Sequence, residues 1–267
     1  ADGAGSVVRK SMYLHKKFLF SFSQDYLTHG YKELSIPPGE FGTFRTDKHV
    51  LHIWPRGEDM LIALPNLDGS FTVTLFLPYS DSDYCFDNLT TPEMVTEYFT
   101  KEFPDVLELI PNLAEEFFKN PTGPLGTIKC SPWHSYGKTL LIGDAAHAIV
   151  PFYGQGMNAS FEDVTVFDDI LNEMEDQDWH TIFKANQKRR KPDTDAIADL
   201  AVDNFHEMKE HTASDLFQQK RKLEMAFEEF FPGQYHSKYS LVTFKEDIGY
   251  KEAKTRGFNN EPNYLYW

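Results

Sequence analysis

The sequence is poor in cysteine and in long apolar runs, and each shortage excludes a class of protein. Only Cys85 and Cys130 are present among 267 residues. They form no metal-binding or redox spacing, which favours a reducing compartment. No stretch approaches about 18 consecutive apolar residues, so we expect a soluble chain without a membrane-spanning helix.

Positive charge is also scarce. Lysine and arginine total 26 against 41 aspartate and glutamate, a net charge of −15, which argues against a nucleic acid or an anionic membrane as partner. The basic run 188–191 is interpreted as a solvated helix end. The ten histidines form no metal-ligand set, so no metal is expected. Hydrophobic residues make up 41%, enough to bury the core of one large or two small domains.

A third feature is missing. No Gly-x-Gly-x-x-Gly follows an N-terminal strand, the pattern with which Rossmann folds bind dinucleotide phosphates. The nearest match, residues 154–159, lies far along the chain in a different context. The chain starts at Ala1 without an initiator methionine, and we interpret it as a fragment.

Residues 140–158 are the most informative stretch. The apolar run 139–142 predicts a buried strand that ends at Gly143-Asp144, the usual ligand crevice of α/β folds. Gly154-Gln-Gly156 then precedes a predicted helix, whose N-terminal N–H groups suit an electron-rich ligand. Its apolar face is predicted from the spacing of Met157, Phe161, Val164, Leu171 and Met174. Taken alone, Gly-Asp-Ala also fits an ordinary strand–loop–helix crossover.

The whole run Gly143-Asp-Ala-Ala-His147, with Pro151 and the glycines behind it, resembles the second flavin-binding motif of the FAD-dependent aromatic hydroxylases. The resemblance implies that Asp144 hydrogen-bonds the ribityl chain of FAD and that the helix after Gly156 faces the flavin pyrimidine. For His147 we expect a structural hydrogen bond. The cofactor-binding residues expected from it are Asp2, Gly143, Asp144, Pro151, Gly154, Gly156, Met157 and Asn158.

Residues 1–9 resemble the end of another motif of that family, Gly-Ala-Asp-Gly followed by Ser-x-Val-Arg. The resemblance places Asp2 near the FAD pyrophosphate and the path of NADPH. An ordinary glycine-rich turn is the alternative.

Between the two motifs the pattern turns to short strands. Asn66-Leu-Asp-Gly69 predicts a hairpin turn, and Phe18, Phe20 and Phe22 alternate with Leu19 and Ser21. The predicted strands cover 26–37, 50–54, 60–64, 71–77 and 125–131, with helices near 92–103 and 111–119. The phrases at 29–34, 51–56, 63–66 and 71–76 resemble the branch of the hydroxylases that acts on kynurenine.

After residue 178 the sequence predicts amphipathic helices with a break at Pro192. The segments 203–208 and 239–244 resemble C-terminal parts of the same branch, in which an Asn and a Tyr hold the amino-acid end of the substrate. The resemblance gives those roles to Asn204 and Tyr239.

The fold class expected is therefore α/β (α+β), part of an FAD-binding aromatic-hydroxylase fold with an inserted antiparallel substrate sheet and a C-terminal helical region. The expected boundaries are 1–12 for the end of the first FAD-domain segment, 13–128 for the substrate sheet, 129–190 for the second FAD-domain segment and 191–267 for the helical region.

The resemblance implies an FAD- and NADPH-dependent monooxygenase that uses O₂ to hydroxylate L-kynurenine beside its aniline nitrogen, in tryptophan degradation and pyridine nucleotide biosynthesis. It also implies the cytosolic face of the outer mitochondrial membrane, through an anchor absent from this chain. No catalytic acid or base is expected, since the substrate's amine activates its own ring. The expected substrate residues are Ile62, Leu64, Phe76, Pro151, Phe152, Asn204, Met208 and Tyr239.

Two alternatives stay open. The chain could be an inactive truncated product or a binding remnant, or it could belong to a flavin hydroxylase for another phenol or aniline. A flavin absorbance spectrum of the purified chain separates the first alternative from an active flavoprotein.

Overall fold

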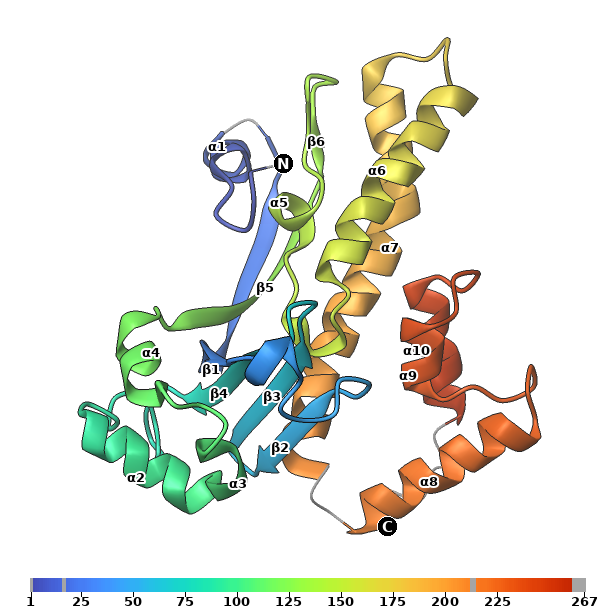
Figure 1. The fold of residues 1–267 in the computed structure, drawn as a ribbon. Coiled ribbons are helices and arrows are strands. Elements are labelled where there is room, and N and C mark those ends of the chain that lie inside the picture. The colour runs from blue at the N-terminus through green and yellow to red at the C-terminus, as the bar shows by residue number, and fades with distance from the viewer. Residues whose placement is uncertain (1, 16–17, 212–214, 261–267) are drawn as a thin grey trace. The chain divides into compact units, whose positions relative to one another are not determined.

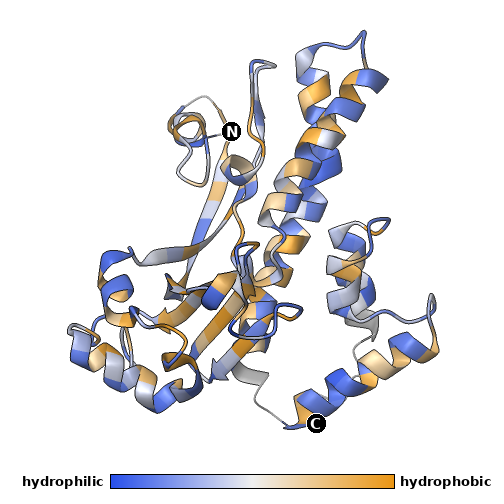
Figure 2. Ribbon diagram, in the orientation of Figure 1, coloured by the Kyte–Doolittle hydropathy of each residue, from blue (hydrophilic) through white to orange (hydrophobic). Residues whose placement is uncertain are grey.

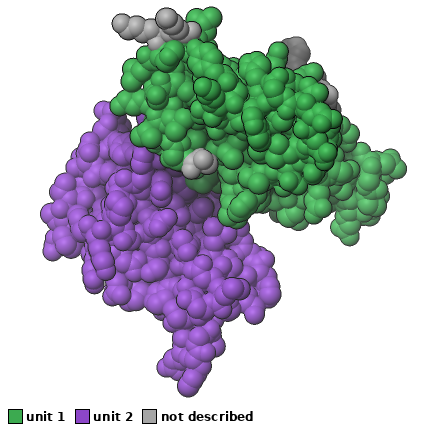
Figure 3. Space-filling view, turned by 90° about the horizontal axis from the view of Figure 1, so that it is seen from above, with its two compact units in different colours: residues 1–25, 126–205, 218–267 green, residues 26–125, 206–217 purple. Residues whose placement is uncertain are grey.

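The computed structural model describes residues 2–15, 18–211 and 215–260. The chain divides into two compact units, shown in different colours in Figure 3. Unit 1 comprises residues 1–25, 126–205 and 218–267, and unit 2 comprises residues 26–125 and 206–217.

Unit 2 is built on an antiparallel meander (Figure 1). The strand order in the described part of the chain is β2-β3-β4-β1-β5. The Asn66–Gly69 turn joins β3 to β4, with Asn66 N donating to Ser70 O at 2.8 Å, so the predicted hairpin is confirmed. The strands are β1 (Ser21–Ile36), β2 (His52–Arg56), β3 (Asp59–Pro65), β4 (Phe71–Pro78) and β5 (Gly123–Ser131). Residues 21–25 of β1 and 126–131 of β5 belong to unit 1.

One face of this sheet packs against short helices and forms the core of the unit. Leu61, Val73 and Leu75 point to that face and are fully buried, together with Tyr98 and Phe99 from α2. Strand residues alternate between the two faces, so their neighbours Ile62, Thr74 and Phe76 lie on the other face. The helical elements are η1 (Glu40–Gly42), α2 (Pro92–Glu102), α3 (Pro104–Leu107), α4 (Leu113–Lys119) and the π-helix η3 (Glu207–His211).

The start of α2 is fixed locally. Thr91 caps it by accepting a hydrogen bond from Met94 N at 3.3 Å, and Pro92 occupies the first turn, where its missing N–H costs nothing. The predicted helix at 92–103 is confirmed. The one expected at 111–119 begins later, at Leu113, because residues 110–112 form a turn after α3.

Unit 1 is mainly helical, and α6 and α7 run side by side in it (Figure 1). Figure 2 shows apolar and polar residues interspersed along both of these helices. Its elements are α1 (Val7–Leu14), β6 (His134–Ser135), β7 (Thr139–Leu140), α5 (Asp144–His147), η2 (Pro151–Tyr153), α6 (Gly156–Glu173), α7 (Trp179–His206), α8 (Asp215–Phe230), α9 (Lys238–Thr243) and α10 (Tyr250–Asn260).

The alternation of Phe18, Phe20 and Phe22 is confirmed. All three pack on the small core around Trp133, whereas Leu19 between them is 96% exposed. The mixed α/β class with an antiparallel sheet and helices is confirmed as well. In the described ranges, no helix is both long and apolar enough to span a membrane.

Two predictions for α6 and the segment before it were wrong. The buried strand predicted at 139–142 is only the two-residue strand β7, which is half-buried and pairs antiparallel with β6. On α6 the predicted apolar face points outward, with Met157 68%, Phe161 65% and Val164 52% exposed. The helix instead buries Ala159, Asp163 and Ile170, because Asp163 takes part in a buried ionic network.

Two predictions for α7 were also wrong. The helix does not break at Pro192, which lies inside a continuous helix from Trp179 to His206. A proline removes one backbone hydrogen bond, and here buried side chains on either side, Arg190 and Thr194, hold the helix in place. The basic run at 188–191 is no solvated helix end, since Arg190 is 1% exposed.

Asp59 is a buried carboxylic acid in unit 2, at the start of β3. It is 6% exposed and accepts a hydrogen bond from Tyr98 Oη at 2.9 Å. Burial raises the pKa of Asp59 to about 6, although the Tyr98 hydrogen bond works in the opposite direction. The native state therefore holds a proton on Asp59 that the unfolded chain, with a pKa near 3.8, releases earlier as the pH rises.

The sign of the resulting pH dependence follows from linkage. Between pH 4 and 6 the native state binds more protons than the unfolded state, so this group makes stability fall as the pH rises through that window. Asp59→Asn removes the buried charge and keeps an acceptor for Tyr98. We expect the variant to be more stable than the parent by about 1–3 kcal/mol at pH 8, from about 1.4 kcal/mol per pKa unit, and equally stable near pH 3.5.

Urea denaturation at the two pH values measures this difference. The matched control is Asp105→Asn, which removes an exposed carboxylate that accepts from Trp54 Nε1 at 2.7 Å. If the two variants gained equal stability against unfolding at pH 8, burial of Asp59 would not be the cause of the gain.

Candidate cofactor-binding turn

A tight turn in unit 1 presents one carboxylate. Gly143 has φ +60° and ψ −148°, a conformation open to glycine but strained for other residues, and it leads directly into α5. Gly143 and residues 145–148 are buried, and Asp144 between them is exposed. The Asp144 side chain is therefore accessible to a ligand, while the residues on both sides of it are buried.

The amide side of this turn is held by Asp163 of α6. This side chain is fully buried, and it accepts from Gly143 N at 2.8 Å and from His147 Nε2 at 2.6 Å. Arg190 Nε of α7 donates to its other oxygen at 2.8 Å. Burial alone would raise the pKa of Asp163, but these hydrogen bonds outweigh it and lower the pKa below its usual value. His147 thus makes the structural hydrogen bond expected of it.

The carbonyl side is held by two buried side chains from other segments. Arg9 Nη1 donates to Ala145 O at 2.8 Å, and its other terminal nitrogen donates to Ala4 O. Cys130 Sγ lies 3.2 Å from Ala146 O, and burial raises the pKa of this thiol to about 11, so it stays protonated and donates. The carbonyl oxygens of Ala145 and Ala146 thus both have side-chain donors from elsewhere in the chain.

Asp2 lies in a different setting from Asp144. Its carboxylate caps α1, accepting from Val8 N at 3.2 Å, and hydrogen bonding to the Ser6 side chain lowers its pKa. Asp2 and Ala145 line one hollow of about 250 Å³, with Val8 and residues 138–141. Pockets for whole drug-sized ligands span about 300–1,000 Å³, so this hollow fits part of a dinucleotide.

The glycine loop before α6 is open. Gly154 has φ +67°, and an added Cβ there would meet no atom within 4 Å. No acidic side chain lies in the first turn of α6, and no side chain caps it. Gln155 of this loop is buried, and its Oε1 accepts hydrogen bonds from Asn158 Nδ2 at 2.9 Å and from Tyr250 Oη at 3.1 Å. The N–H groups of this helix start suit a ligand that carries negative charge.

The neighbouring turn η2 gathers the expected substrate residues of unit 1. Asn204 Nδ2 donates to Phe152 O at 2.7 Å, and the Tyr239 ring stacks on Tyr153 with centroids 6.0 Å apart. Phe152 and Asn204 are buried, Tyr239 is half-buried and Pro151 is exposed.

The expected substrate residues of unit 2 share a sheet face. Ile62 and Leu64 of β3 and Phe76 of β4 lie on the face opposite the helices, with Ile62 half-buried, Leu64 47% exposed and Phe76 buried. Met208 lies in η3 of the same unit and is half-buried.

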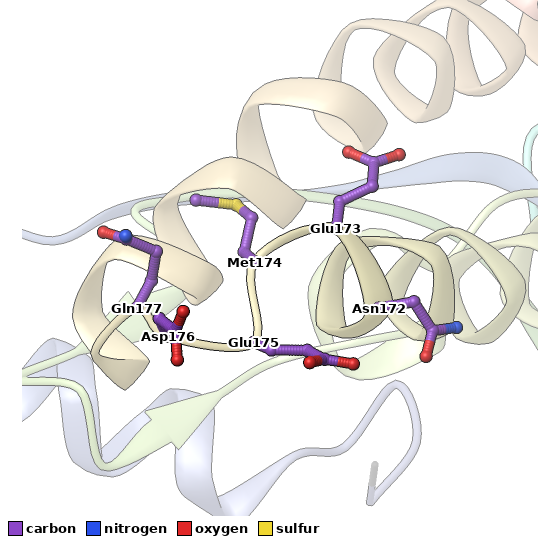
Figure 4. Close-up of a pocket in the computed structure, with 6 residues that line it drawn as sticks. All are labelled: Asn172, Glu173, Met174, Glu175, Asp176 and Gln177. Carbon is purple, nitrogen blue, oxygen red and sulfur yellow. The ribbon is translucent and has the colours of Figure 1, made fainter.

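A second hollow of unit 1 lies at the turn from α6 to α7 and is unrelated to the cofactor motif. Figure 4 shows it lined by Asn172, Glu173, Met174, Glu175, Asp176 and Gln177. The length of α6 separates it from the glycine loop by about 25 Å at 1.5 Å per residue. Its acidic rim does not favour an anionic cofactor.

The sequence patterns assigned no role at the turn to the residues that hold it: Arg9, Cys130, Asp163 and Arg190. One signal was available, since Asp163 is an acid three positions from Ser160 and four from Ala159 on the side of α6 occupied by small residues. Its partner Arg190 was hidden among the basic residues around it. Only the pairing of α6 with α7 brings these two side chains together.

Known proteins that are similar to this chain support FAD as the cofactor. The family model described as an FAD binding domain matches residues 110–201. The chain is 51% identical over 257 residues to the kynurenine 3-monooxygenase of Flavobacterium johnsoniae, covering 96% of this chain and 56% of that protein. It is 47% identical over 274 residues to the kynurenine 3-monooxygenase of Dictyostelium discoideum, covering 97% and 58%.

A solved structure shows the same fold. The crystal structure of Klebsiella pneumoniae HpxO complexed with FAD and uric acid aligns with a TM-score of 0.62 at 18% identity, covering 84% of this chain and 54% of that chain. The chain spans a little over half the length of the curated relatives it matches. The resemblance to the FAD-dependent aromatic hydroxylases is thereby confirmed, in sequence and in fold.

The conformation of Gly143 gives a prediction for stability. An added Cβ would be strained at φ +60° and would meet Ser160 Oγ at 3.3 Å. We expect Gly143→Ala to lower the free energy of unfolding by about 1–3 kcal/mol. Urea denaturation measures it, with Gly5→Ala as the control, since a Cβ at Gly5 meets nothing within 4 Å and its φ is not positive. Equal effects at the two glycines would show that the turn conformation is not required.

Proposed function

Because this chain is a relative of the kynurenine 3-monooxygenases over almost its whole length, we propose that it forms the substrate-binding and second FAD-binding part of an FAD-dependent aromatic monooxygenase. The proposed substrate is L-kynurenine, hydroxylated on the ring beside the aniline nitrogen with O₂. The relatives' names support the substrate, and the FAD binding domain matched at 110–201 supports the cofactor.

The single observation that carries the proposal is the turn that presents Asp144. The carboxylate is exposed, while the flanking residues are buried and hydrogen bonds from Gly143 N to Asp163 and from Arg9 to Ala145 O hold the backbone on both sides. A carboxylate held in this way is an acceptor for hydroxyl groups, and a charge-assisted hydrogen bond of that kind is stronger than a neutral one. FAD carries such hydroxyls on its ribityl chain, so we assign Asp144 to them.

The residues around the turn fit the rest of such a cofactor. FAD, when bound and reduced, supplies the oxygen chemistry that side chains cannot perform. The start of α6, with Gly154 before it, Gly156 as its first residue and no acid in its first turn, would stabilise negative charge on the reduced ring system. Met157 and Asn158 are exposed in this first turn, and Pro151 is exposed on η2. We propose that these residues contact FAD.

The same chain would orient the substrate. We propose that the sheet residues Ile62, Leu64 and Phe76, with Met208, contact the aromatic ring. Phe152 of unit 1 is a further proposed substrate-binding residue. Asn204 and Tyr239 would hold the amino-acid end, since both belong to the side chains packed around η2. No acid–base residue is required, because the amine of the substrate activates the ring.

Further details rest on the resemblance alone. We propose NADPH as the reductant, with Asp2 near its path. We also propose residues 129–190 as the second FAD-domain segment, 13–128 as the substrate sheet domain and 191–267 as the helical region. The outer mitochondrial membrane is the proposed location, with a place in tryptophan degradation toward pyridine nucleotides.

Loss of the Asp144 carboxylate tests the cofactor assignment. We expect Asp144→Ala to weaken FAD binding about tenfold to hundredfold, since one charge-assisted hydrogen bond is worth roughly 1.5–3 kcal/mol. Equilibrium dialysis against FAD measures it, with Asp168→Ala, an exposed acid further along α6, as the control. Unchanged affinity in Asp144→Ala would contradict the assignment. If the parent chain takes up no FAD at all, the alternative of an inactive fragment is favoured.

Removal of the Tyr239 hydroxyl tests the substrate assignment. Tyr239→Phe keeps the ring stacked on Tyr153 and removes one polar contact. In the FAD-reconstituted protein we expect KM for kynurenine to rise about fivefold to thirtyfold, equivalent to about 1–2 kcal/mol for one hydrogen bond. More of the NADPH consumed should end as hydrogen peroxide, because a loosely held ring is oriented less well.

The control is a kynurenine analogue that lacks the α-amino and carboxylate groups. It should be an equally poor substrate for the parent and for Tyr239→Phe, because the group that Tyr239 contacts is already absent. A KM for the analogue that rises as much as that for kynurenine would make Tyr239 a packing residue. Other anilines and phenols should also be tested as substrates. If one of them is hydroxylated with a higher kcat/KM than kynurenine, the chain belongs to a hydroxylase for that substrate.

A further inference from the structure

We propose that Asp163 and Arg190 are positioning residues that hold the Gly143–His147 turn in its cofactor-binding shape before any cofactor arrives. The proposal rests on the proposed function only for its last step, which is the effect on FAD. The first steps concern the chain by itself.

The geometry assigns Asp163 to the turn and to no ligand. Both of its oxygens are used inside the protein, one by Gly143 N and His147 Nε2, the other by Arg190 Nε. Its side chain is completely buried, so it cannot contact a cofactor. Asp163 can influence a bound cofactor only through the turn.

The two anchoring points span the turn. Gly143 N is the amide directly before Asp144, and the His147 side chain lies at the other end of α5. The ring of His147 packs on Trp133, with centroids 5.2 Å apart. A single carboxylate therefore fixes both ends of the segment that carries Asp144, and the direction in which Asp144 points follows from it.

Arg190 keeps that carboxylate in place. Its guanidinium is 2% exposed and makes contacts on three sides: with Asp163, with Glu162 Oε1 at 2.8 Å and with Ala159 O at 3.2 Å. An unpaired buried carboxylate would be costly, so Asp163 can serve the turn only while Arg190 is present. The long reach of the arginine also fixes the register of α7 against α6 at this level.

Single substitutions would leave one charge buried and unpaired and could unfold the chain. The test therefore uses the double variant Asp163→Leu with Arg190→Met, which replaces the ion pair by apolar side chains of similar length. Such replacements are often neutral or stabilising for the fold as a whole. The matched control is the double variant Asp168→Leu with Arg189→Met, the same changes at exposed positions of the same two helices.

The first readout is amide hydrogen exchange of the cofactor-free chain. We expect the amides of residues 143–147 to exchange at least about tenfold faster in the Asp163/Arg190 variant, because a local opening then costs less, while the amides in the middle of α6 and α7 keep their rates. In the control variant the turn should exchange as in the parent. A turn that is as protected in the Asp163/Arg190 variant as in the parent overturns the proposal. Faster exchange throughout α6 and α7 overturns it as well, since the pair would then act on the fold in general.

The second readout is a mutant cycle with Asp144 on FAD affinity, followed by equilibrium dialysis. If the pair acts by aiming Asp144, its replacement should weaken FAD binding about tenfold in the parent, yet no more than about twofold once Asp144 is alanine. Equal losses in both backgrounds contradict positioning through Asp144. If the parent chain takes up no FAD, the proposed function fails for this chain, and the exchange rates at the turn alone decide the present proposal.

Discussion

A buried ion pair between Asp163 and Arg190 is the interaction on which the candidate site depends. It joins α6 to α7, and through Gly143 N and His147 it fixes the turn that carries Asp144. Burying two charges costs several kcal/mol per ion before compensation, and here each charge has several partners. The same contacts explain why α6 turns its polar Asp163 inward and exposes Met157, Phe161 and Val164.

The rest of unit 1 completes this arrangement from the other side. Arg9 connects the turn at Ala4 with the turn at Ala145, so two segments far apart in the sequence share one guanidinium. Both segments carry an exposed aspartate, Asp2 and Asp144, and both belong to motifs that resemble those of flavin hydroxylases. We therefore propose that the buried charged side chains Arg9, Asp163 and Arg190 position the site, and that the exposed carboxylates Asp2 and Asp144 contact the cofactor.

Sequence patterns predicted the structure correctly where it depends on residues close together in the chain. The Asn66–Gly69 hairpin, the Thr91-Pro92 helix start and the alternation of Phe18, Phe20 and Phe22 are set by turn chemistry, capping and side-chain period. The glycine–aspartate turn was found because its residue types are unusual in combination. Predictions failed where a distant partner decides: the buried face of α6, the continuity of α7 at Pro192 and the burial of Arg190 all depend on helix pairing. The spacing of Asp163 from Ala159 and Ser160 hinted at the buried face of α6, but its partner Arg190 on α7 could not be identified from either helix alone.

We propose that the Asp144 carboxylate contacts the cofactor, whereas the Asp163 carboxylate holds the turn. The most direct measurement is carboxyl ¹³C NMR of the chain labelled at aspartate, with FAD added stepwise. The account predicts that the Asp144 resonance moves with FAD concentration and that the Asp163 resonance stays where it is, because its hydrogen bonds exist before binding. A shift of Asp163 with FAD, or an Asp144 resonance that does not respond while FAD binds, would contradict it.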